Sequence, residues 1–450
     1  MLQRDDLPVL AQALEHLDGA FAGVPGTQAP DADALRRVLI DLAERLRDSY
    51  PFHSPSYAGQ MLKPPHPVAR LAYQLTQWIN PNNHALDGGP ATSALEKEAV
   101  AELAGLFGWR DRHLGHLAAG GTMANLEALW VARERHGAAP LLASAHSHYT
   151  HCRLAALLRV EHCSIPTDAR VRMDLEATEA ALREHGPTTL VATLGTTGYG
   201  TVDPLADLVS LARQYGARVH VDAAYGGYFR LLDDLPTAHH FEAASQADSI
   251  VIDPHKHGLQ PYGCGAVLFR DPGDGVVHAH DSPYTYFSSA ELHLGEISLE
   301  CSRAGAAAAA LWATQCLLPY ETGGEFAAML ASARAAGVAL YDYLDGTDAW
   351  LPVLEPDLDI LVWAPRAPSL SAMSAHSQQL FDRLAARDIH LALLKTPVDL
   401  LGPQFAGVER DAAELVCLRA CLMKPEHLDW LPTLIDALES ELAASAGDAS

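Results

Sequence analysis

Apolar and polar positions alternate in different ways along the chain, and the pattern changes twice. In AQALEHL (11–17) and ADALRRVLIDLAERLRDSY (32–50), apolar residues recur three and four positions apart, the spacing of a helix with one buried face. Two stretches rich in proline, glycine or asparagine, PFHSPSYAGQMLKPPHP (51–67) and NPNNHALDGGPATS (80–93), interrupt this pattern as loops do. A further helix is predicted from about Ala94 to Leu106.

Beyond about residue 115, short apolar runs alternate with helix-like segments. The segments LEATEAALREHG (175–186) and PLADLVSLARQYG (204–216) both close on a glycine, as helix C-termini prefer. Runs that are apolar on both faces and alternate with helices indicate a parallel sheet covered on both sides. We therefore predict an α/β domain with a mainly parallel sheet flanked by helices. The runs are PLLASA (140–145), TLVATLG (189–195), RVHVDAA (218–224), SIVID (249–253) and GAVLFR (265–270).

The pattern changes again after a long helix predicted at 303–318. The strand-like runs DILVWAP (359–365) and ELVCLRACL (414–422) alternate with amphipathic helices, which favours a small α+β domain. We predict three units: an N-terminal helical segment with a loop region (1–95), a large α/β domain (96–322) and a small C-terminal α+β domain (323–450).

Composition narrows the class of protein. The 450 residues carry 31 Lys and Arg against 56 Asp and Glu, a formal charge of −25, which argues against nucleic acid and anionic membranes as partners. The seven cysteines form no CxxC pair, so reduced thiols in a reducing compartment are expected. The N-terminus lacks the apolar region of a secretion signal, and AGAAAAALWATQCLLP (304–319) is too short to span a bilayer. We expect a cytoplasmic enzyme without membrane association.

Four turn-like sequences stand where ligands bind in α/β proteins: GGTMAN (120–125), GTTGYG (195–200), DAAYGG (222–227) and DPHKHG (253–258). Ligands of open α/β sheets bind at the carboxyl ends of the strands, so these turns are expected to meet at one edge. GGTMAN offers two glycines and the Thr122 hydroxyl at a helix N-terminus, which suits a phosphate. The same residues often serve only as a helix cap.

Asp222 and Lys256 are complementary candidates at that edge. A carboxylate at the mouth of a sheet either caps the following turn or pairs with a cation, and a protonated pyridine nitrogen is such a cation. A desolvated lysine has a lowered pKa and becomes a usable amine nucleophile. Together with a phosphate-binding turn, these two residues meet the requirements of pyridoxal phosphate.

Histidines cluster in HSHYTH (146–151) and HKH (255–257), where metal ligation is one interpretation. No HExxH motif or Cys/His quartet accompanies them, so no metal site is predicted. Stacking of His148 on a flat ring is another interpretation, and the residues alone leave that choice open.

These motifs resemble those of the group II pyridoxal-phosphate decarboxylases, which include the aromatic-amino-acid, tyrosine and glutamate decarboxylases. The resemblance runs from about Tyr50 to the C-terminus and rests above all on HxDAAY followed by HK. It implies a fold-type I, pyridoxal-phosphate-dependent transferase-like architecture, pyridoxal 5′-phosphate as the cofactor, and a homodimer with shared active sites. The motifs are SAHSHYTHCRLAALL (144–158), VATLGTTGYGTVDPL (191–205), VHVDAAYGG (219–227), ADSIVIDPHKHG (247–258) and ECSRAG (300–305), with NPNN (80–83) and PATSALE (90–96) similar to the family's N-terminal substrate loop.

The resemblance assigns a role to each matching residue. Lys256 matches the lysine that binds the cofactor covalently, and His255 lies beside it on the phosphate side. Asp222 matches the partner of the pyridinium, and Ala224 matches the small residue packed under the ring. His148 matches the histidine that stacks on the opposite face and helps to position the substrate carboxylate.

Further positions follow from the same resemblance. The phosphate loop corresponds to Gly121 and Thr122, and Thr197 corresponds to a threonine beside the cofactor and the substrate. Arg303 matches an arginine of the family's SR motif, while Arg153 departs from the pattern by standing where the family often has lysine.

The family's mobile loop carries a tyrosine that returns a proton to Cα after CO2 leaves. The corresponding stretch, 278–296, offers Tyr284, Tyr286 and His293, and the two tyrosines are the catalytic candidates. Members that lack this tyrosine divert to oxidative deamination, so the identity of the donor bears on the outcome of the reaction.

The implied activity removes the α-carboxylate of an L-amino acid to give the amine and CO2. Phe52, Tyr57 and Ser93 are candidate substrate contacts, and the aromatic residues favour an aromatic substrate such as tyrosine, DOPA or tryptophan. An acidic substrate, glutamate or aspartate, is the alternative, for which Lys63 is an available cation. A cysteine-desulfurase-like or aldehyde-lyase-like enzyme also presents His-Lys and a stacked histidine, and a catalytically silent or metal-binding protein is the hypothesis outside this chemistry.

Overall fold

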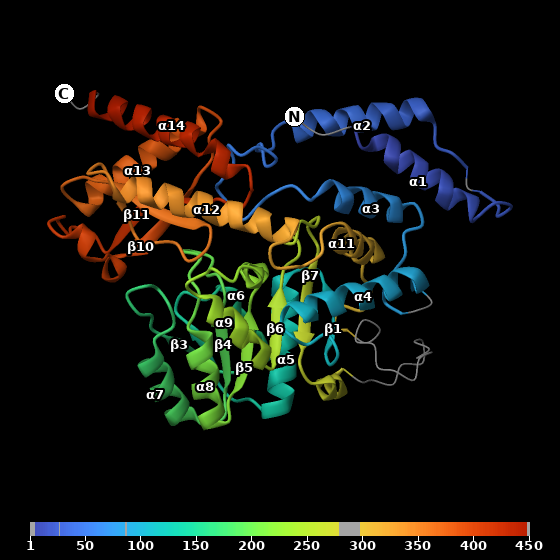
Figure 1. Ribbon diagram of the computed structural model, residues 1–450, viewed down its shortest axis with the longest axis horizontal. Helices are drawn as coiled ribbons and strands as arrows, with labels where there is room; N and C mark the ends of the chain where they lie inside the picture. The colour runs from blue at the N-terminus through green and yellow to red at the C-terminus, as the bar shows by residue number, and fades with distance from the viewer. Residues whose placement is uncertain (1–4, 27, 86–87, 279–297, 448–450) are drawn as a thin grey trace.

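A computed structural model of the chain describes residues 5–26, 28–85, 88–278 and 298–447. Figure 1 shows a central sheet with helices around it, the C-terminal elements (orange and red) on one side above the sheet, and the N-terminal helices (blue) on the other.

The N-terminal segment is helical, as predicted. Asp31 begins α2 by accepting a hydrogen bond from the Asp33 N–H, and prolines stand in the first turns of α1, α3 and α4. α4 begins at Pro90 rather than at Ala94, because proline presets the backbone angle where no N–H is needed. The helices are α1 (Leu7–Gly19), α2 (Ala32–Leu46), α3 (Pro67–Gln77) and α4 (Pro90–Leu106).

The central sheet has seven strands in the order β1-β7-β6-β5-β4-β2-β3. Strands β3, β2, β4, β5 and β6 run parallel, while β7 is antiparallel to its neighbours β6 and β1. Every residue of β4, β5 and β6 is buried, which explains why these runs are apolar on both faces. The predicted fold class is confirmed. The strands are β1 (Leu114–Ala118), β2 (Leu141–Ser144), β3 (His162–Ile165), β4 (Thr189–Thr193), β5 (Arg218–Asp222), β6 (Ser249–Ile252) and β7 (Gly265–Phe269).

Helices flank this sheet. α5 packs against β5, β6 and β7, and α8 packs against β4 and β5. Gly216 ends α8 in the left-handed conformation, in agreement with the predicted glycine cap. The helices are α5 (Gly121–His136), α6 (Thr150–Leu158), α7 (Leu175–His185), α8 (Leu205–Tyr215), α9 (Ala238–Ala243) and α11 (Gly305–Leu317), with short 3-10 turns at Gly227–Leu231, Ala244–Gln246, Pro272–Val277, Val398–Leu400 and Pro403–Phe405.

The C-terminal part holds a separate antiparallel sheet in the order β10-β11-β9-β8. Its core includes the buried rings of Trp350 and Trp363. The predicted division at residues 95/96 and 322/323 stays a prediction. The elements are α12 (Glu325–Asp345), β8 (Trp350–Pro352), β9 (Ile360–Pro365), α13 (Leu370–Ala385), β10 (Ala392–Pro397), β11 (Glu414–Cys421) and α14 (His427–Gly447).

The hydrophobic pattern does not predict β1 and β3. β1 carries His116 at a fully buried position, and β3 lies at the end of the sheet with only Ile165 buried. Neither strand therefore presents the continuous apolar run that marks the inner strands. Within the described residues, no helix combines the length and the apolar character needed to cross a bilayer.

Candidate active site

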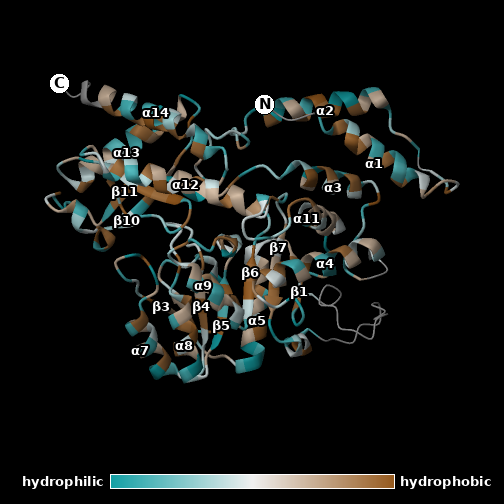
Figure 2. Ribbon diagram, in the orientation of Figure 1, coloured by the Kyte–Doolittle hydropathy of each residue, from teal (hydrophilic) through white to brown (hydrophobic). Residues whose placement is uncertain are grey.

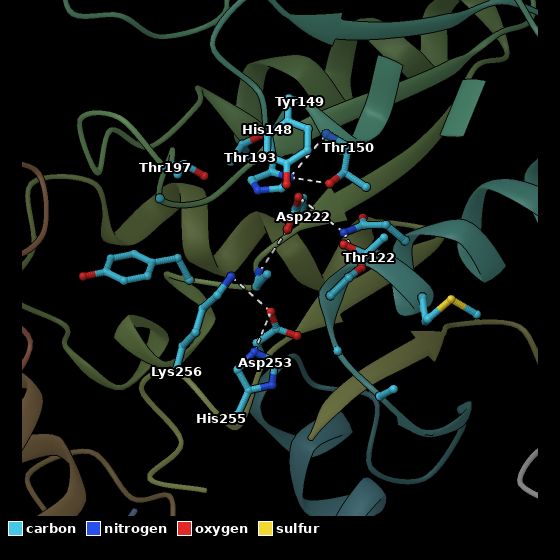
Figure 3. A pocket seen from close by; sticks show the side chains of 18 of the residues that line it. Thr122, His148, Tyr149, Thr150, Thr193, Thr197, Asp222, Asp253, His255 and Lys256 are labelled. Carbon is cyan, nitrogen blue, oxygen red and sulfur yellow. Dashed lines mark hydrogen bonds and ion pairs between the residues drawn. The ribbon is translucent and has the colours of Figure 1, made fainter. Parts of the chain in front are cut away.

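The four turns meet at one edge of the central sheet, around a cavity of about 440 Å³. β1 is parallel to β6, since both are antiparallel to β7, so the carboxyl ends of β1, β4, β5 and β6 lie at the same edge. Figure 3 shows Asp222 between His148 on one side and the Lys256–Asp253 pair on the other. The predicted cofactor residues all line this cavity: Gly121, Thr122, His148, Thr197, Asp222, Ala224, His255 and Lys256.

Two glycines are required by the close approach of these turns. A Cβ on Gly121 would lie 2.7 Å from Asp253 Oδ2, so a larger residue would push the GGTMAN turn away from the turn that carries Lys256. Gly195 has a φ of +97°, in the left-handed region, and a Cβ there would lie 3.1 Å from the Gly226 nitrogen. Both positions therefore favour glycine over any residue with a side chain.

The N-terminus of α5 opens onto the cavity. The N–H groups of Met123 and Ala124 donate to the Gly120 carbonyl at 3.0 Å, whereas those of Gly121 and Thr122 precede the first helical hydrogen bonds. Free N–H groups and the positive end of the helix dipole favour an anion. This end of the cavity therefore fits a phosphate.

Lys256 pairs with an acid that the sequence analysis did not single out. Its Nζ lies 3.0 Å from Asp253 Oδ2, and the Asp253 side chain is 3% exposed against 21% for that of Lys256. His255 Nε2 lies 3.6 Å from the same oxygen. The signal that could have found Asp253 is a carboxylate at the end of an apolar run, three residues before the lysine.

Asp222 ends β5 and is buried. Its Oδ1 accepts a hydrogen bond from the Ala224 N–H at 3.1 Å, and its Oδ2 accepts one from His151 Nε2 at 2.9 Å. Burial by itself raises the pKa of a carboxyl group. Here the pKa of Asp222 is held well below its usual range, because several favourable contacts outweigh burial. These contacts are the hydrogen bond and electrostatic attraction of His151, the charge of Lys256 and the hydrogen bond from the Ala224 N–H. Asp222 is therefore ionised and suited to a cationic partner.

His148 lines the cavity just before α6. Its Nδ1 accepts a hydrogen bond from the Thr150 N–H at 3.3 Å, so the neutral ring carries its proton on Nε2. The ring of Tyr149 lies 4.3 Å away at an angle of 33°. Burial lowers the pKa of His148, which keeps the ring neutral near pH 7 and suits it to stacking on a flat ligand.

Three buried polar atoms of cavity residues have no hydrogen-bonding partner among the described residues: Asp253 Oδ1, His255 Nδ1 and Thr193 Oγ1. Buried polar groups are normally paired, so these atoms mark places for a ligand. The cavity thus offers an anion-binding helix end, a carboxylate for a cationic ring nitrogen and an amine, a set that fits pyridoxal phosphate. The part of the chain that the structure describes contains no group of three or more His, Cys, Asp or Glu side chains placed to hold a metal.

The predicted substrate contacts Phe52, Tyr57 and Ser93 do not line this cavity. The ring of Tyr57 packs against Phe52 at 4.8 Å and His390 at 6.1 Å, and Ser93 is buried within α4. Their substrate role stays a prediction. The candidate proton donors Tyr284, Tyr286 and His293 lie outside the described residues.

Arg419 joins the rim of the cavity to the C-terminal sheet and was not identified from the sequence. It lies on β11, is 5% exposed, and donates to the carbonyls of Thr197 at 2.6 Å, Gly198 at 2.9 Å and Gly59 at 3.2 Å. One side chain therefore holds the GTTGYG turn and the N-terminal loop together. An arginine inside the apolar run ELVCLRACL is the only sequence signal of this contact.

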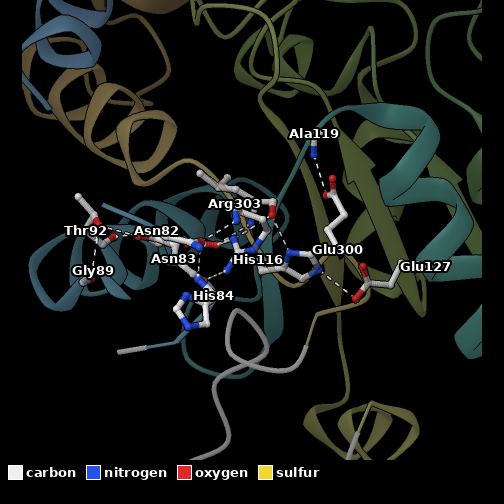
Figure 4. Close-up of polar contacts among 12 residues, drawn as sticks. Asn82, Asn83, His84, Gly89, Thr92, His116, Ala119, Glu127, Glu300 and Arg303 are labelled. Carbon is white, nitrogen blue, oxygen red and sulfur yellow. Dashed lines mark hydrogen bonds and ion pairs between the residues drawn. The ribbon is translucent and has the colours of Figure 1, made fainter. Parts of the chain in front are cut away.

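A buried polar network supports the strand that leads into GGTMAN (Figure 4). Glu96 accepts hydrogen bonds from Arg303, from Asn83 Nδ2 at 2.7 Å and from the Leu117 N–H at 3.0 Å. Arg303 also donates to the carbonyls of Leu117 at 3.0 Å and Asn83 at 2.7 Å. The network ties the NPNN, PATSALE and ECSRAG motifs to β1.

A second cluster in the same region holds β1 against α5. Glu127 Oε1 lies 2.9 Å from His116 Nε2 and 2.7 Å from His278 Nε2. Burial raises the pKa of a carboxyl group, but the two histidines outweigh it and hold the pKa of Glu127 well below its usual range. Beside it, the Ala119 N–H donates to Glu300 Oε2 at 2.8 Å, directly before GGTMAN.

Comparison with known proteins agrees with this site. The model of the family described as "Pyridoxal-dependent decarboxylase conserved domain" matches residues 25–318. An L-tyrosine decarboxylase of Enterococcus faecium is 28% identical over 470 aligned residues, which cover 79% of this chain and 77% of that protein. A probable L-aspartate decarboxylase of Halobacterium salinarum is 36% identical over 307 residues, which cover 67% and 82%.

Solved structures share the fold. The structure of Oryza sativa TDC with PLP and tryptamine has a TM-score of 0.78 at 18% identity and covers 99% of each chain. That of mouse CSAD has a TM-score of 0.77 at 20% identity, with 97% and 98% covered. At these identities the likeness bears on the fold alone.

Proposed function

The chain belongs to the pyridoxal-dependent decarboxylase family, and from this premise we propose that its substrate is an L-amino acid with an aromatic side chain. As a member of the family it is a pyridoxal-phosphate-dependent carboxy-lyase acting on an amino acid. Which amino acid it accepts depends on the walls of the cavity.

The observation that carries the proposal is the charge of those walls. Among the described residues that line the cavity, Lys256 is the single lysine or arginine, and Asp222 and Asp253 are acidic. The carboxylate of an acidic side chain would therefore lack a cation to pair with. Tyr149 and Tyr262, 63% and 55% exposed, offer aromatic surface at the same cavity.

The acidic alternative keeps one argument in its favour, the 36% identity to the probable L-aspartate decarboxylase. Its available cation, Lys63, lines a second cavity of about 210 Å³ together with Lys424. Lys63 donates to the Met423 carbonyl at 3.4 Å, and burial lowers its pKa to about 8. This placement favours the aromatic substrate.

The roles of the chain's own residues follow from the geometry. When bound, pyridoxal phosphate supplies the electron sink for the pair released from the Cα–carboxylate bond. Lys256 would anchor the cofactor through its Nζ, and Asp253 Oδ2, 3.0 Å from that nitrogen, would orient the amine. His148 would cover one face of the ring, and Asp222 would pair with the ring nitrogen.

In the overall reaction, one proton replaces the carboxylate group that leaves Cα. The Cα–carboxylate bond breaks, the carboxylate carbon leaves as CO2, and a proton takes its place at Cα to give the amine. Tyr284 and Tyr286 are the proposed donors of that proton.

The test is a panel of substrates given to the purified protein with pyridoxal phosphate: tyrosine, DOPA, tryptophan, glutamate and aspartate. We expect equal amounts of CO2 and amine, with the largest kcat/KM for an aromatic amino acid. A larger kcat/KM for aspartate or glutamate would contradict the aromatic assignment. Alanine from cysteine, or a bare aldehyde with ammonia, would identify a different reaction.

We also propose that the protein is a homodimer with shared active sites. α2 has no buried residue in this chain, and Figure 2 shows apolar segments (brown) along it. The exposed side chains form one stripe at helical spacing, and such a helix is stabilised mainly by tertiary packing of its apolar face. A second copy of the chain would cover it. The stripe consists of Leu35, Leu39, Leu42 and Leu46, which are 48 to 60% exposed.

A cytoplasmic location completes the proposal. All seven cysteines are unpaired, including the exposed Cys152, Cys301 and Cys316. Free exposed thiols are typical of a reducing compartment. Detection of the protein in a cytosolic fraction would test this assignment.

A further inference from the structure

His151 is a buried histidine whose imidazole hydrogen-bonds to a cavity residue, Asp222. It lies in the first turn of α6, its side chain is 0% exposed, and its Nε2 lies 2.9 Å from Asp222 Oδ2. His151 does not line the cavity, whereas Asp222 does. The hydrogen bond of this imidazole therefore acts on a bound ligand through the Asp222 carboxylate.

The direction of this hydrogen bond follows from the acceptor. An ionised carboxylate only accepts hydrogen bonds, so His151 Nε2 carries the proton that is donated to Asp222. The other ring nitrogen, Nδ1, is buried and has no hydrogen-bonding partner among the described residues. Among the described residues, the side chain of His151 therefore makes its hydrogen bond to Asp222 alone.

The Asp222 carboxylate is held from three sides. The Ala224 N–H donates to Oδ1 at 3.1 Å, and the Asn125 amide lies 3.5 Å from Oδ2, the oxygen that His151 binds. Asn125 is itself oriented by the Gly121 carbonyl at 2.8 Å and by His220 Nε2 at 2.8 Å. A carboxylate has about four lone-pair positions, so Asp222 keeps capacity for one partner in the cavity.

We propose that His151 is a positioning residue that keeps the proton shared by Asp222 and the pyridine nitrogen of pyridoxal phosphate on the nitrogen. A donor to a carboxylate stabilises the ionised form and makes it a weaker base. The proton between Asp222 and the ring nitrogen therefore stays with the nitrogen, and the protonated ring is the stronger electron sink. The inference rests on the cofactor and on the role proposed for Asp222, and it does not depend on which amino acid is the substrate.

Three variants separate this role from a structural one. His151→Leu removes the donor at similar volume, and His151→Gln keeps an N–H donor at about the position of Nε2. His116→Leu is the matched control, because His116 is also 0% exposed and bonded to a carboxylate, Glu127, but does not line the cavity. It reports the general effect of losing a buried histidine.

The readout is the 15N resonance of pyridoxal phosphate labelled at its ring nitrogen and bound to each protein without substrate. We expect a protonated nitrogen in the wild type, in His151→Gln and in His116→Leu, and a shift toward the neutral position in His151→Leu. At saturating cofactor we expect kcat of His151→Leu to fall roughly 10- to 100-fold with little change in KM, the range for one hydrogen bond to a charged group.

An unchanged nitrogen resonance in His151→Leu would overturn the proposal, even if turnover fell, because the residue would then be structural. If that variant does not fold, the wild type still decides: a 15N spectrum that places the His151 proton on Nδ1 would contradict the donor role. The resonance is read without substrate, so a protein that binds the cofactor but releases no CO2 would fail the proposed function and leave this test intact.

Discussion

Replacing Arg303 by methionine tests whether the buried network in Figure 4 supports the cofactor-binding edge. The Arg303 side chain is 7% exposed and that of Glu96 is 1% exposed, so Arg303→Met leaves a buried carboxylate without its cation. Breaking a buried ion pair from one side costs about 3–5 kcal/mol. Asn83 and the Leu117 N–H still donate to Glu96, so we expect a loss of about 3 kcal/mol in the free energy of unfolding.

The chain offers a matched control in Arg110, which pairs with Glu102 at the surface. Their side chains are 56% and 40% exposed, and such pairs contribute about 1 kcal/mol or less. Urea unfolding of both variants at pH 7 compares the same chemical change in two environments. The reasoning would be refuted if Arg303→Met lost no more stability than Arg110→Met.

The same comparison has a dependence on pH. Burial raises the pKa of the Glu96 carboxyl, but the Arg303 charge and the hydrogen bonds outweigh it, so the folded pKa lies below its usual value. The stability that Glu96 contributes is therefore present above the unfolded pKa of about 4.3 and is lost as the pH falls through the folded value. The difference in the free energy of unfolding between wild type and Arg303→Met should therefore become smaller in acid. If this difference stays constant down to about pH 3, the lost stability does not come from the Glu96–Arg303 pair.

Three further variants test other features. Lys256→Ala should abolish CO2 release and the visible absorbance of the lysine-bound cofactor without unfolding the protein. Replacement of the exposed Lys97 by alanine should leave both the CO2 release and the absorbance unchanged. A Lys256→Ala variant that stays coloured and active would contradict the anchoring role. Burial, then the charge of Lys63, lowers the pKa of Lys424 to about 8, so wild-type stability should rise by up to about 3 kcal/mol between pH 8 and about 10.4 as the folded state sheds a proton that the unfolded state keeps. In urea unfolding, Lys424→Met should show a smaller rise than the wild type, because only the contribution of Lys63, whose pKa burial also lowers to about 8, remains. An identical pH profile would refute the shift of Lys424. The double variant Leu39→Glu/Leu42→Glu should raise the dissociation constant of the dimer at least about a hundredfold, as measured by sedimentation. Arg37→Glu, on the opposite face of α2, should leave the dissociation constant unchanged. An unchanged dissociation constant in the double variant would reject α2 as the interface.

The sequence predicts the inner strands and the place where the four turns meet, because both depend on patterns within short segments of the chain. SIVI is apolar throughout and precedes DPHKHG, and a parallel sheet brings all carboxyl ends to one edge. The partners of the central residues depend on contacts between distant segments. His151 meets Asp222 across 71 positions and Arg419 meets Thr197 across 222 positions, and no spacing in the sequence encodes either contact.

Contacts between residues close together in the sequence are easier to predict, yet the sequence did not identify Asp253. It stands three residues before Lys256, but an acid after an apolar run is equally typical of a turn cap. β3 was missed for a different reason, because an edge strand buries little and therefore shows no apolar run. Burial and pairing across segments thus decide which residues surround the cavity.

The Glu96 network also orders events during folding. Glu96 contacts Asn83, Leu117 and Arg303 across 13, 21 and 207 positions of the chain. The first two contacts close early, whereas the third needs a long loop whose closure is slow. On the ribosome, the contacts at the β1 end that leads into GGTMAN are complete only after synthesis has passed residue 303, so the proposed phosphate-binding end of the cavity forms late in the biogenesis of this enzyme.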